Sequence, residues 1–267
     1  MFALVADYLM GWAMASADGA RKQRAEWPPH PDRVFMALAA AWFETGCDPA
    51  EGAALRWLET LPPPALCASA CEQRAAVTHY VPVNDAGLSS ARTIESLVAA
   101  SELAWDKAKD AGLALLPEHR SRQPRSFPVA LPYHPVVHFC WPGEVPAEHR
   151  EALAALCAKV TAIGHSASVV RMGLDESPPP PNWVPGEGPS ALRLRISGRG
   201  RLDYLERRMN KQAMLAYAEM RQAVQQAKGQ ARQKLQRQLD ERFPAPPVSL
   251  RPEPGLWQAY VRASVAQ

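Results

Sequence analysis

The chain has 267 residues, of which 47% are hydrophobic and 21% charged, and its formal net charge is +3. This composition is typical of a globular protein with a buried core and excludes an intrinsically disordered chain. No run of 18 consecutive apolar residues occurs, so the sequence predicts no membrane-spanning helix. The five cysteines are irregularly spaced, which indicates reduced thiols in a cytoplasmic protein and favours neither a disulfide framework nor a zinc site.

Alternating apolar residues predict a strand over 2–8 at the start of the chain. Prolines rule out a helix until about Pro31, and the apolar run 34–44 then predicts a buried helix that ends at Gly46. A short amphipathic helix is predicted next, over 50–60. The later elements are predicted as strands over 76–83, 127–141 and 168–172 and as a helix over 146–163, closed by Gly164.

This order of strand, helix, strand, strand, helix and strand is the βαββαβ order of ferredoxin-like and RRM-like domains, so we expect an α+β fold over residues 1–177. Residues 84 to about 126 form a long insertion between two strands. The insertion contains a helical stretch over 95–111 and a basic tip.

The last third of the chain differs from the first two. A proline-rich connector over 178–190 leads into a strand over 192–197, one long helix over 202–239 and a closing strand over 256–265. We therefore expect 191–267 to form a separate unit of strand, long basic helix and final strand.

Positive charge is concentrated in one segment of the chain. Residues 192–243 contain 13 Lys and Arg against five Asp and Glu, a net charge of +8, whereas the rest of the chain sums to −5. Polyanion binding is the usual reason for such asymmetry. A solvated helix face or a docking surface for other subunits has the same pattern, and that alternative stays open.

Three motifs resemble one family of CRISPR-associated proteins. They are EWPPHPDRVFMAL at 26–38, WLETLPPP at 57–64 and HYVPVND at 79–85. Together they are similar to the Csb-two family of type I-U (I-G) systems, whose members look like fusions of a Cas-five-type subunit to a Cas-six-type nuclease. The similarity covers most of residues 1–175. Members of that family are longer, and this chain corresponds to their N-terminal Cas-five-type portion.

The resemblance implies a RAMP fold, ferredoxin-like, with a thumb insertion at about 84–126. It also implies a function: a subunit of a type I Cascade complex that binds and caps the 5′ handle of the crRNA. The implied partners are a Cas-seven-type backbone subunit, a large Cas-eight-type subunit, a Cas-six-type domain and, as a further ligand, target DNA. Because the nuclease portion is missing, we expect no catalytic residue, no metal and no cofactor, and no membrane contact.

The start of the first predicted helix is the first candidate RNA site, at Arg24, Trp27, His30 and Arg33. A helix N-terminus attracts phosphate, arginines add charge, and rings can stack on unpaired bases. In the alternative interpretation, Trp27 anchors the core and the prolines only stiffen the approach to the helix.

Three further groups of residues are candidates for RNA contact. The turn at Gly164 offers hydroxyls and backbone N–H groups, and the thumb tip and the basic helix offer charge. The residues are His165, Ser166, Ser168 and Arg171 near the turn, Arg120, Arg122 and Arg125 at the tip, and Arg199, Arg201, Arg207, Arg208 and Lys211 on the helix. The alternatives are an ordinary helix stop, a solvated loop and a solvated helix face.

A second function remains open at this point, namely a metal-independent endoribonuclease that processes precursor crRNA. Such an enzyme needs only a side chain that can move the proton of the attacking 2′-hydroxyl, and His30 or His165 could do this. A third interpretation is a protein that only docks other subunits.

Overall fold

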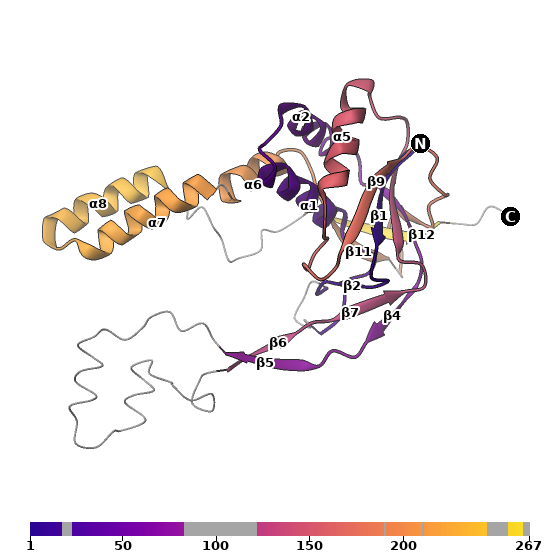
Figure 1. The fold of residues 1–267 in the computed structure, drawn as a ribbon, viewed down its shortest axis with the longest axis horizontal. Helices are drawn as coiled ribbons and strands as arrows, with labels where there is room; N and C mark the ends of the chain where they lie inside the picture. Colours follow the sequence, from indigo (N-terminus) through magenta and orange to yellow (C-terminus); the bar gives the residue numbers. More distant parts are fainter. Residues whose placement is uncertain (18–22, 83–121, 190, 210, 245–255, 264–267) are drawn as a thin grey trace, which may run out of the picture.

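The computed structural model describes residues 1–17, 23–82, 122–189, 191–209, 211–244 and 256–263. It is an α+β protein in which helices α1, α2 and α5 gather beside a central sheet, and two arms extend from this body toward the same side (Figure 1). One arm is a helical hairpin and the other a two-stranded ribbon. Every helix in the described ranges is too short or too polar to cross a membrane.

The central sheet has seven strands, and all of the pairings between neighbours are antiparallel. In spatial order they are β11 (Leu192–Ile196), β12 (Leu256–Arg262), β10 (Trp183–Pro185), β3 (Ala65–Ala68), β8 (Val136–Trp141), β1 (Phe2–Tyr8) and β9 (Val170–Asp175).

Two crossovers interleave within this sheet. The chain passes from β1 to β3 through α1 (Pro31–Glu44) and α2 (Pro49–Leu58), and from β8 to β9 through α5 (Ala147–Lys159). Because β8 lies between β1 and β3, and β1 lies between β8 and β9, each crossover skips one strand of the other pair. This arrangement confirms the predicted α+β class.

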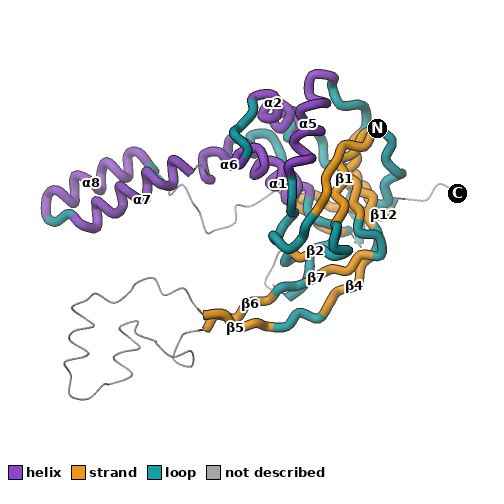
Figure 2. The backbone as a smooth tube through the Cα atoms, viewed as in Figure 1, coloured by secondary structure: helices purple, strands orange, loops and turns teal. Residues whose placement is uncertain are grey.

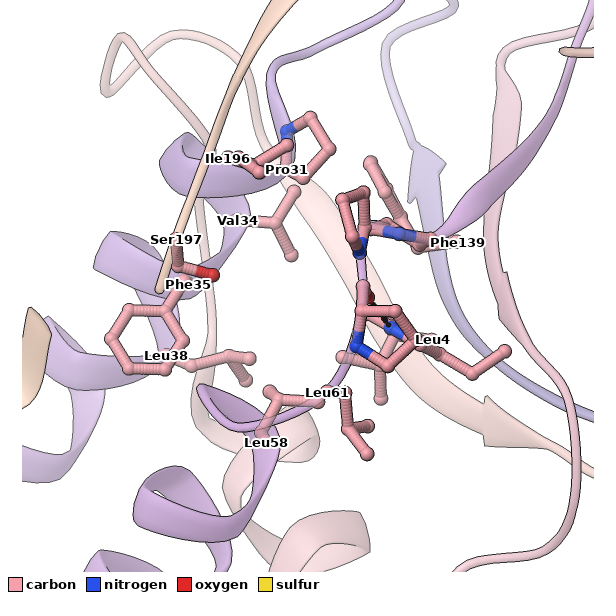
Figure 3. A pocket seen from close by; sticks show the side chains of 14 residues that line it. Leu4, Pro31, Val34, Phe35, Leu38, Leu58, Leu61, Phe139, Ile196 and Ser197 are labelled. Atoms are coloured by element: carbon pink, nitrogen blue, oxygen red, sulfur yellow. Dashed lines mark hydrogen bonds between the residues drawn. The ribbon is translucent and has the colours of Figure 1, made fainter. Parts of the chain in front are cut away.

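The core lies between the sheet and the helices. Leu4 and Phe139 point from β1 and β8 toward Val34, Phe35 and Leu38 of α1, as Figure 3 shows. The void that remains among these side chains measures only about 20 Å³, room for about one water molecule. Its lining is almost wholly apolar, so it is a packing gap in the core and not a ligand site.

The predicted strand over 76–83 is not part of the central sheet. Its residues form β5 (Thr78–Pro82), which pairs with β6 (Arg122–Ser126) in the projecting ribbon. The strand beside β8 is instead β3, whose four residues are too few to show a periodic pattern. A second small sheet at the base of the ribbon has the order β2 (Ala13–Met14), β7 (Val129–Pro132) and β4 (Cys71–Arg74).

The prediction of one long basic helix was wrong. The segment forms α6 (Arg201–Met209), α7 (Lys211–Gln226) and α8 (Gly229–Arg242), and α7 and α8 fold back on each other as a hairpin (Figure 2). Gly229 adopts φ +56° at the reversal, a conformation that glycine tolerates best. The apolar spacing continues across the turn because both helices need an apolar stripe to pack together, so periodicity alone could not reveal the break.

The predicted separation of the C-terminal third is not seen in the sheet. β10 forms within the expected connector, and β11 and β12 continue the seven-stranded sheet. Asn182 joins the two parts, because its side-chain amide accepts from Ala68 N at 3.1 Å and donates to Ala68 O at 2.9 Å.

Two buried carboxylates fix the start of α6 on the body of the protein. Asp32 of α1 accepts both Nε and Nη2 of Arg201 at 2.8 Å. Glu59 accepts the backbone N–H groups of Gly200 and Leu202 at 2.9 and 2.8 Å. A carboxylate at a helix N-terminus accepts hydrogen bonds from the free N–H groups and interacts favourably with the positive end of the helix dipole. The first turn of α6 is therefore held firmly.

Candidate nucleic-acid interface

A groove of about 730 Å³ opens where three segments of distant sequence meet. They are the segment before α1, the base of the β5–β6 ribbon and the turn that precedes β9. The polar and aromatic side chains among its lining residues are Ser16, Gln23, Arg33, Thr78, Arg125, Ser126, Phe127 and His165. Within the described ranges, the residues that line the groove include two arginines and no carboxylate.

An aromatic cluster stands at the edge of this groove. Phe127 is 39% exposed and lies edge to face with His165, with ring centroids 5.8 Å apart. The ring of His79, on β5, also packs against Phe127, with ring centroids 5.7 Å apart. Exposed rings beside cationic side chains are the usual means of holding unpaired bases.

Arg33 is held in place by a buried carboxylate. Glu26 is 4% exposed and accepts Nε and Nη2 of Arg33 at 2.9 and 2.6 Å. It also accepts the backbone N–H of His30 at 2.8 Å. Burial by itself raises the pKa of Glu26, but the hydrogen bonds and charges of His30 and Arg33 outweigh it and lower this pKa to about 2. The cluster therefore orients the Arg33 guanidinium at the wall of the groove.

His30 is buried within the protein. Its Nδ1 accepts the backbone N–H of Arg195 at 2.7 Å, and its Nε2 lies 3.1 Å from Glu26 Oε2. Through these contacts His30 connects the start of α1 to the edge of β11. It does not line the groove.

Trp27 also faces the interior. Its indole N–H donates to Ser69 O at 2.8 Å, and its ring packs against Tyr8 with centroids 5.7 Å apart. This geometry favours the interpretation of Trp27 as a core anchor.

The turn before β9 supplies a third wall of the groove. Helix α5 ends at Lys159, earlier than expected from Gly164, because Val160 is extended and Ala162 pairs with Val169. The buried Ser168 hydroxyl donates to Met14 O and accepts from Met14 N, which fixes the turn to β2.

We expect Gly164→Ala to cost about 1–2 kcal/mol from its backbone alone, because Gly164 has φ +85°. A Cβ there would also lie 3.1 Å from the Ala15 Cβ and 3.3 Å from Cδ of Arg33, which should add to the loss. Gly143 has the same φ with nothing within 4 Å of a Cβ, so Gly143→Ala is the matched control. Urea unfolding of both variants measures the difference, and equal losses would contradict the close packing at Gly164.

The structure brings together only part of the predicted site. Arg33, Arg125 and His165 line the groove, whereas Ser168 is buried and Arg201 is paired with Asp32. Apart from Trp27 and His30, the remaining candidates that are described are exposed and lie outside the groove: Arg24, Ser166, Arg171, Arg199, Arg207 and Lys211. Arg171 pairs with Asp7 at 2.7 Å.

Some predicted contacts lie outside what the structure describes. Arg120 and the helical stretch over 95–111 are outside the described residues, and for Arg122 and Arg208 only the backbone is described. Sequence reasoning missed Phe127 as a groove residue, and it missed His79 as the ring that packs against Phe127. The signal for Phe127 was a single large ring directly after the basic segment 122–126.

Metal-ligating side chains do not gather in the described part of the chain, where no three of His, Cys, Asp or Glu form a potential site. His138 lies 3.8 Å from Asp175 on the sheet face away from the helices. Burial lowers the pKa of His138, against the opposing charge of Asp175.

Comparison with known protein families places this α+β chain among the CRISPR-associated proteins. The matching family is described as CRISPR-associated protein, GSU0054 family, and its model matches residues 2–237. The chain belongs to this family. The groove lies wholly within the matched range, whereas β12 follows it. A search of curated proteins gave no match.

Proposed function

We propose that this chain is the Cas-five-type subunit of a type I Cascade complex and that it holds the 5′ handle of the crRNA in the groove at Arg33, Arg125 and Phe127. The main support is the convergence of cationic and aromatic side chains at one groove in a CRISPR-associated protein. The Csb-two-type motifs at 26–38 and 57–64 support the finer assignment.

The strand order supports a RAMP-type, ferredoxin-like body. β9, β1, β8 and β3 follow one another in the sheet with two interleaved crossovers, which is the split βαβ arrangement. The β5–β6 ribbon then corresponds to the base of the thumb, since it leads into and out of residues 83–121.

The groove suits an unpaired strand better than a duplex. The exposed face of Phe127 offers a stacking platform for a base, and Arg125 and Arg33 offer charge to the adjoining phosphates. The serine and threonine hydroxyls at 16, 78 and 126 are suited to sugar and phosphate oxygens, which position a strand without reading its sequence.

The arms are the proposed contacts with other subunits. We assign the ribbon to the Cas-seven-type backbone subunit and the α7–α8 hairpin to the large Cas-eight-type subunit or to target DNA, in a cytoplasmic complex that also contains a Cas-six-type domain. The hairpin carries exposed cations suited to either partner, including Lys211, Arg232 and Arg237.

Two variants test the groove by different signatures. The slope of log affinity against log salt is negative, and Arg125→Gln should reduce its magnitude by about 1, as expected for one lost phosphate contact. Phe127→Ala should weaken binding by about tenfold or more while leaving the slope unchanged, because stacking carries no charge. Fluorescence anisotropy with a single-stranded RNA carrying the repeat-derived 5′ handle measures both.

Arg150→Gln on α5 is the matched control for charge, since Arg150 is exposed and pairs with Glu176 away from the groove. Wild-type protein that ignores the handle RNA at low salt, or variants that bind like the control, would refute the proposal.

The rival function, cleavage of precursor crRNA, is tested with the same protein. His165 is the only one of its two candidate histidines that lines the groove, because His30 is buried. Specific cleavage of labelled precursor in EDTA that His165→Ala abolishes would favour the endoribonuclease. We expect no cleavage.

A further inference from the structure

A second pocket lies beside the groove and is bordered by the same stretch of chain. Residues 14–16 and 23 contribute to the groove, whereas residues 17 and 24–28 contribute to this second pocket, whose volume is about 270 Å³. Its far wall is formed by β11 and β12, the latter drawn in yellow in Figure 1. The pocket therefore joins the segment before α1 to the C-terminal strands.

One large ring is presented in this pocket. Trp257 of β12 is 42% exposed, and it meets His30 edge to face with ring centroids 5.6 Å apart. By contrast, Trp27 and Trp42 donate their indole N–H groups to backbone oxygens within the protein. Leaving such a large apolar ring in water is costly, so an indole exposed beside a pocket is a favourable stacking surface.

Two cations line the same pocket. Arg24 and Arg193 are exposed, and within the described ranges neither guanidinium makes a hydrogen bond or an ion pair. The acid that also lines the pocket, Glu26, is buried and already accepts hydrogen bonds from Arg33 and from the backbone of His30. The pocket therefore offers an aromatic surface and uncompensated positive charge together.

We propose that this pocket holds one nucleotide, with its base against Trp257 and its phosphate between Arg24 and Arg193. A volume of about 270 Å³ is at the small end of ligand pockets and fits a single nucleotide but no duplex. Since the groove and the pocket share the segment before α1, the nucleotide belongs to the same RNA strand. This inference rests on the proposed function and adds a second stacking position to it.

The test is a double-mutant cycle between protein and RNA. A set of handle RNAs, each with one abasic position, is titrated against wild-type protein and Trp257→Ala. We expect Trp257→Ala to weaken binding of the intact RNA by about tenfold. One abasic position should cost the same in wild-type protein and cost nothing further in the variant, because both changes remove one stacking contact.

Further variants separate stacking from folding. Trp257→Phe should keep most of the affinity because it retains a ring, and Arg193→Gln should lower the salt slope by about 1. Leu256→Ala is the matched control, since Leu256 is the neighbouring exposed residue on the opposite face of β12.

Three results would overturn the inference. In the first, Trp257→Ala binds RNA as well as Leu256→Ala does, whereas Phe127→Ala loses affinity. This result would reject the second pocket and leave the proposal for the groove intact. Wild-type protein that binds no handle RNA would reject both proposals. Calorimetric binding of AMP alone that is lost in Trp257→Ala, with RNA affinity unchanged, would show a pocket for a free nucleotide and contradict its assignment to the strand.

Discussion

Replacing Arg201 with Met is expected to lower the free energy of unfolding by about 3–5 kcal/mol. Asp32 is 1% exposed and its two oxygens accept the Arg201 fork, so the variant leaves an uncompensated carboxylate in the core. Met keeps most of the side-chain length beside Met36, so the loss reports the missing charge more than a missing volume. Guanidinium or urea unfolding followed by circular dichroism measures it.

Arg199→Met is the matched control, because Arg199 is exposed and only two residues away. It should change the free energy of unfolding by less than about 0.5 kcal/mol. If both variants lost the same stability, the Asp32 contact would not anchor α6. The comparison also separates two members of the basic cluster that sequence alone could not distinguish.

Glu26→Gln is expected to have the other large effect, again about 3–5 kcal/mol at neutral pH. The variant cannot accept the Arg33 fork and the His30 N–H as a carboxylate does, and Arg33 would lose its orientation at the groove. Handle-RNA affinity should therefore fall together with stability.

The pH dependence gives this prediction a distinct signature. The pKa of Glu26 is about 2 in the folded protein against an ordinary 4.5, so the unfolded chain binds more protons between these values. The stabilisation is complete above about pH 4.5 and is lost as the pH falls toward 2. Wild-type protein and Glu26→Gln should accordingly converge in stability near pH 2, whereas Glu44→Gln, an exposed control on α1, should follow wild type throughout. A constant gap between wild type and Glu26→Gln across this range would contradict the account.

Local patterns predicted the elements that carry a long apolar run or a clear alternation of apolar residues. The strand at 2–8, the helix beginning at Pro31 and the strand at 192–197 agree closely with β1, α1 and β11. β3 was not predicted because four residues are too few to show a period. The break between α7 and α8 was not predicted because the apolar spacing continues across the turn of a packed hairpin. Such features depend on tertiary partners that no local window contains.

For the candidate site, the sequence predicted which residue types take part better than it predicted where each residue lies. Arg33, Arg125 and His165 were named from three separate motifs, and the structure places them around one groove. His30 has the same chemical type as His165, but its burial depends on the approach of β11 some 165 positions later in the chain. A sequence cannot tell which of two histidines a distant strand will cover.

The position of β12 determines when the edge of the central sheet can form during synthesis of the chain. Among the described strands, β11 pairs only with β12, and β12 lies between β11 and β10. While the ribosome is still making residues 256–262, β11 has no strand to pair with, although the β1, β3 and β8 portion is already available to fold. Residue 257 is therefore made after every residue that lines the groove. If the proposed function holds, a nascent chain completes the groove before it completes the second stacking position.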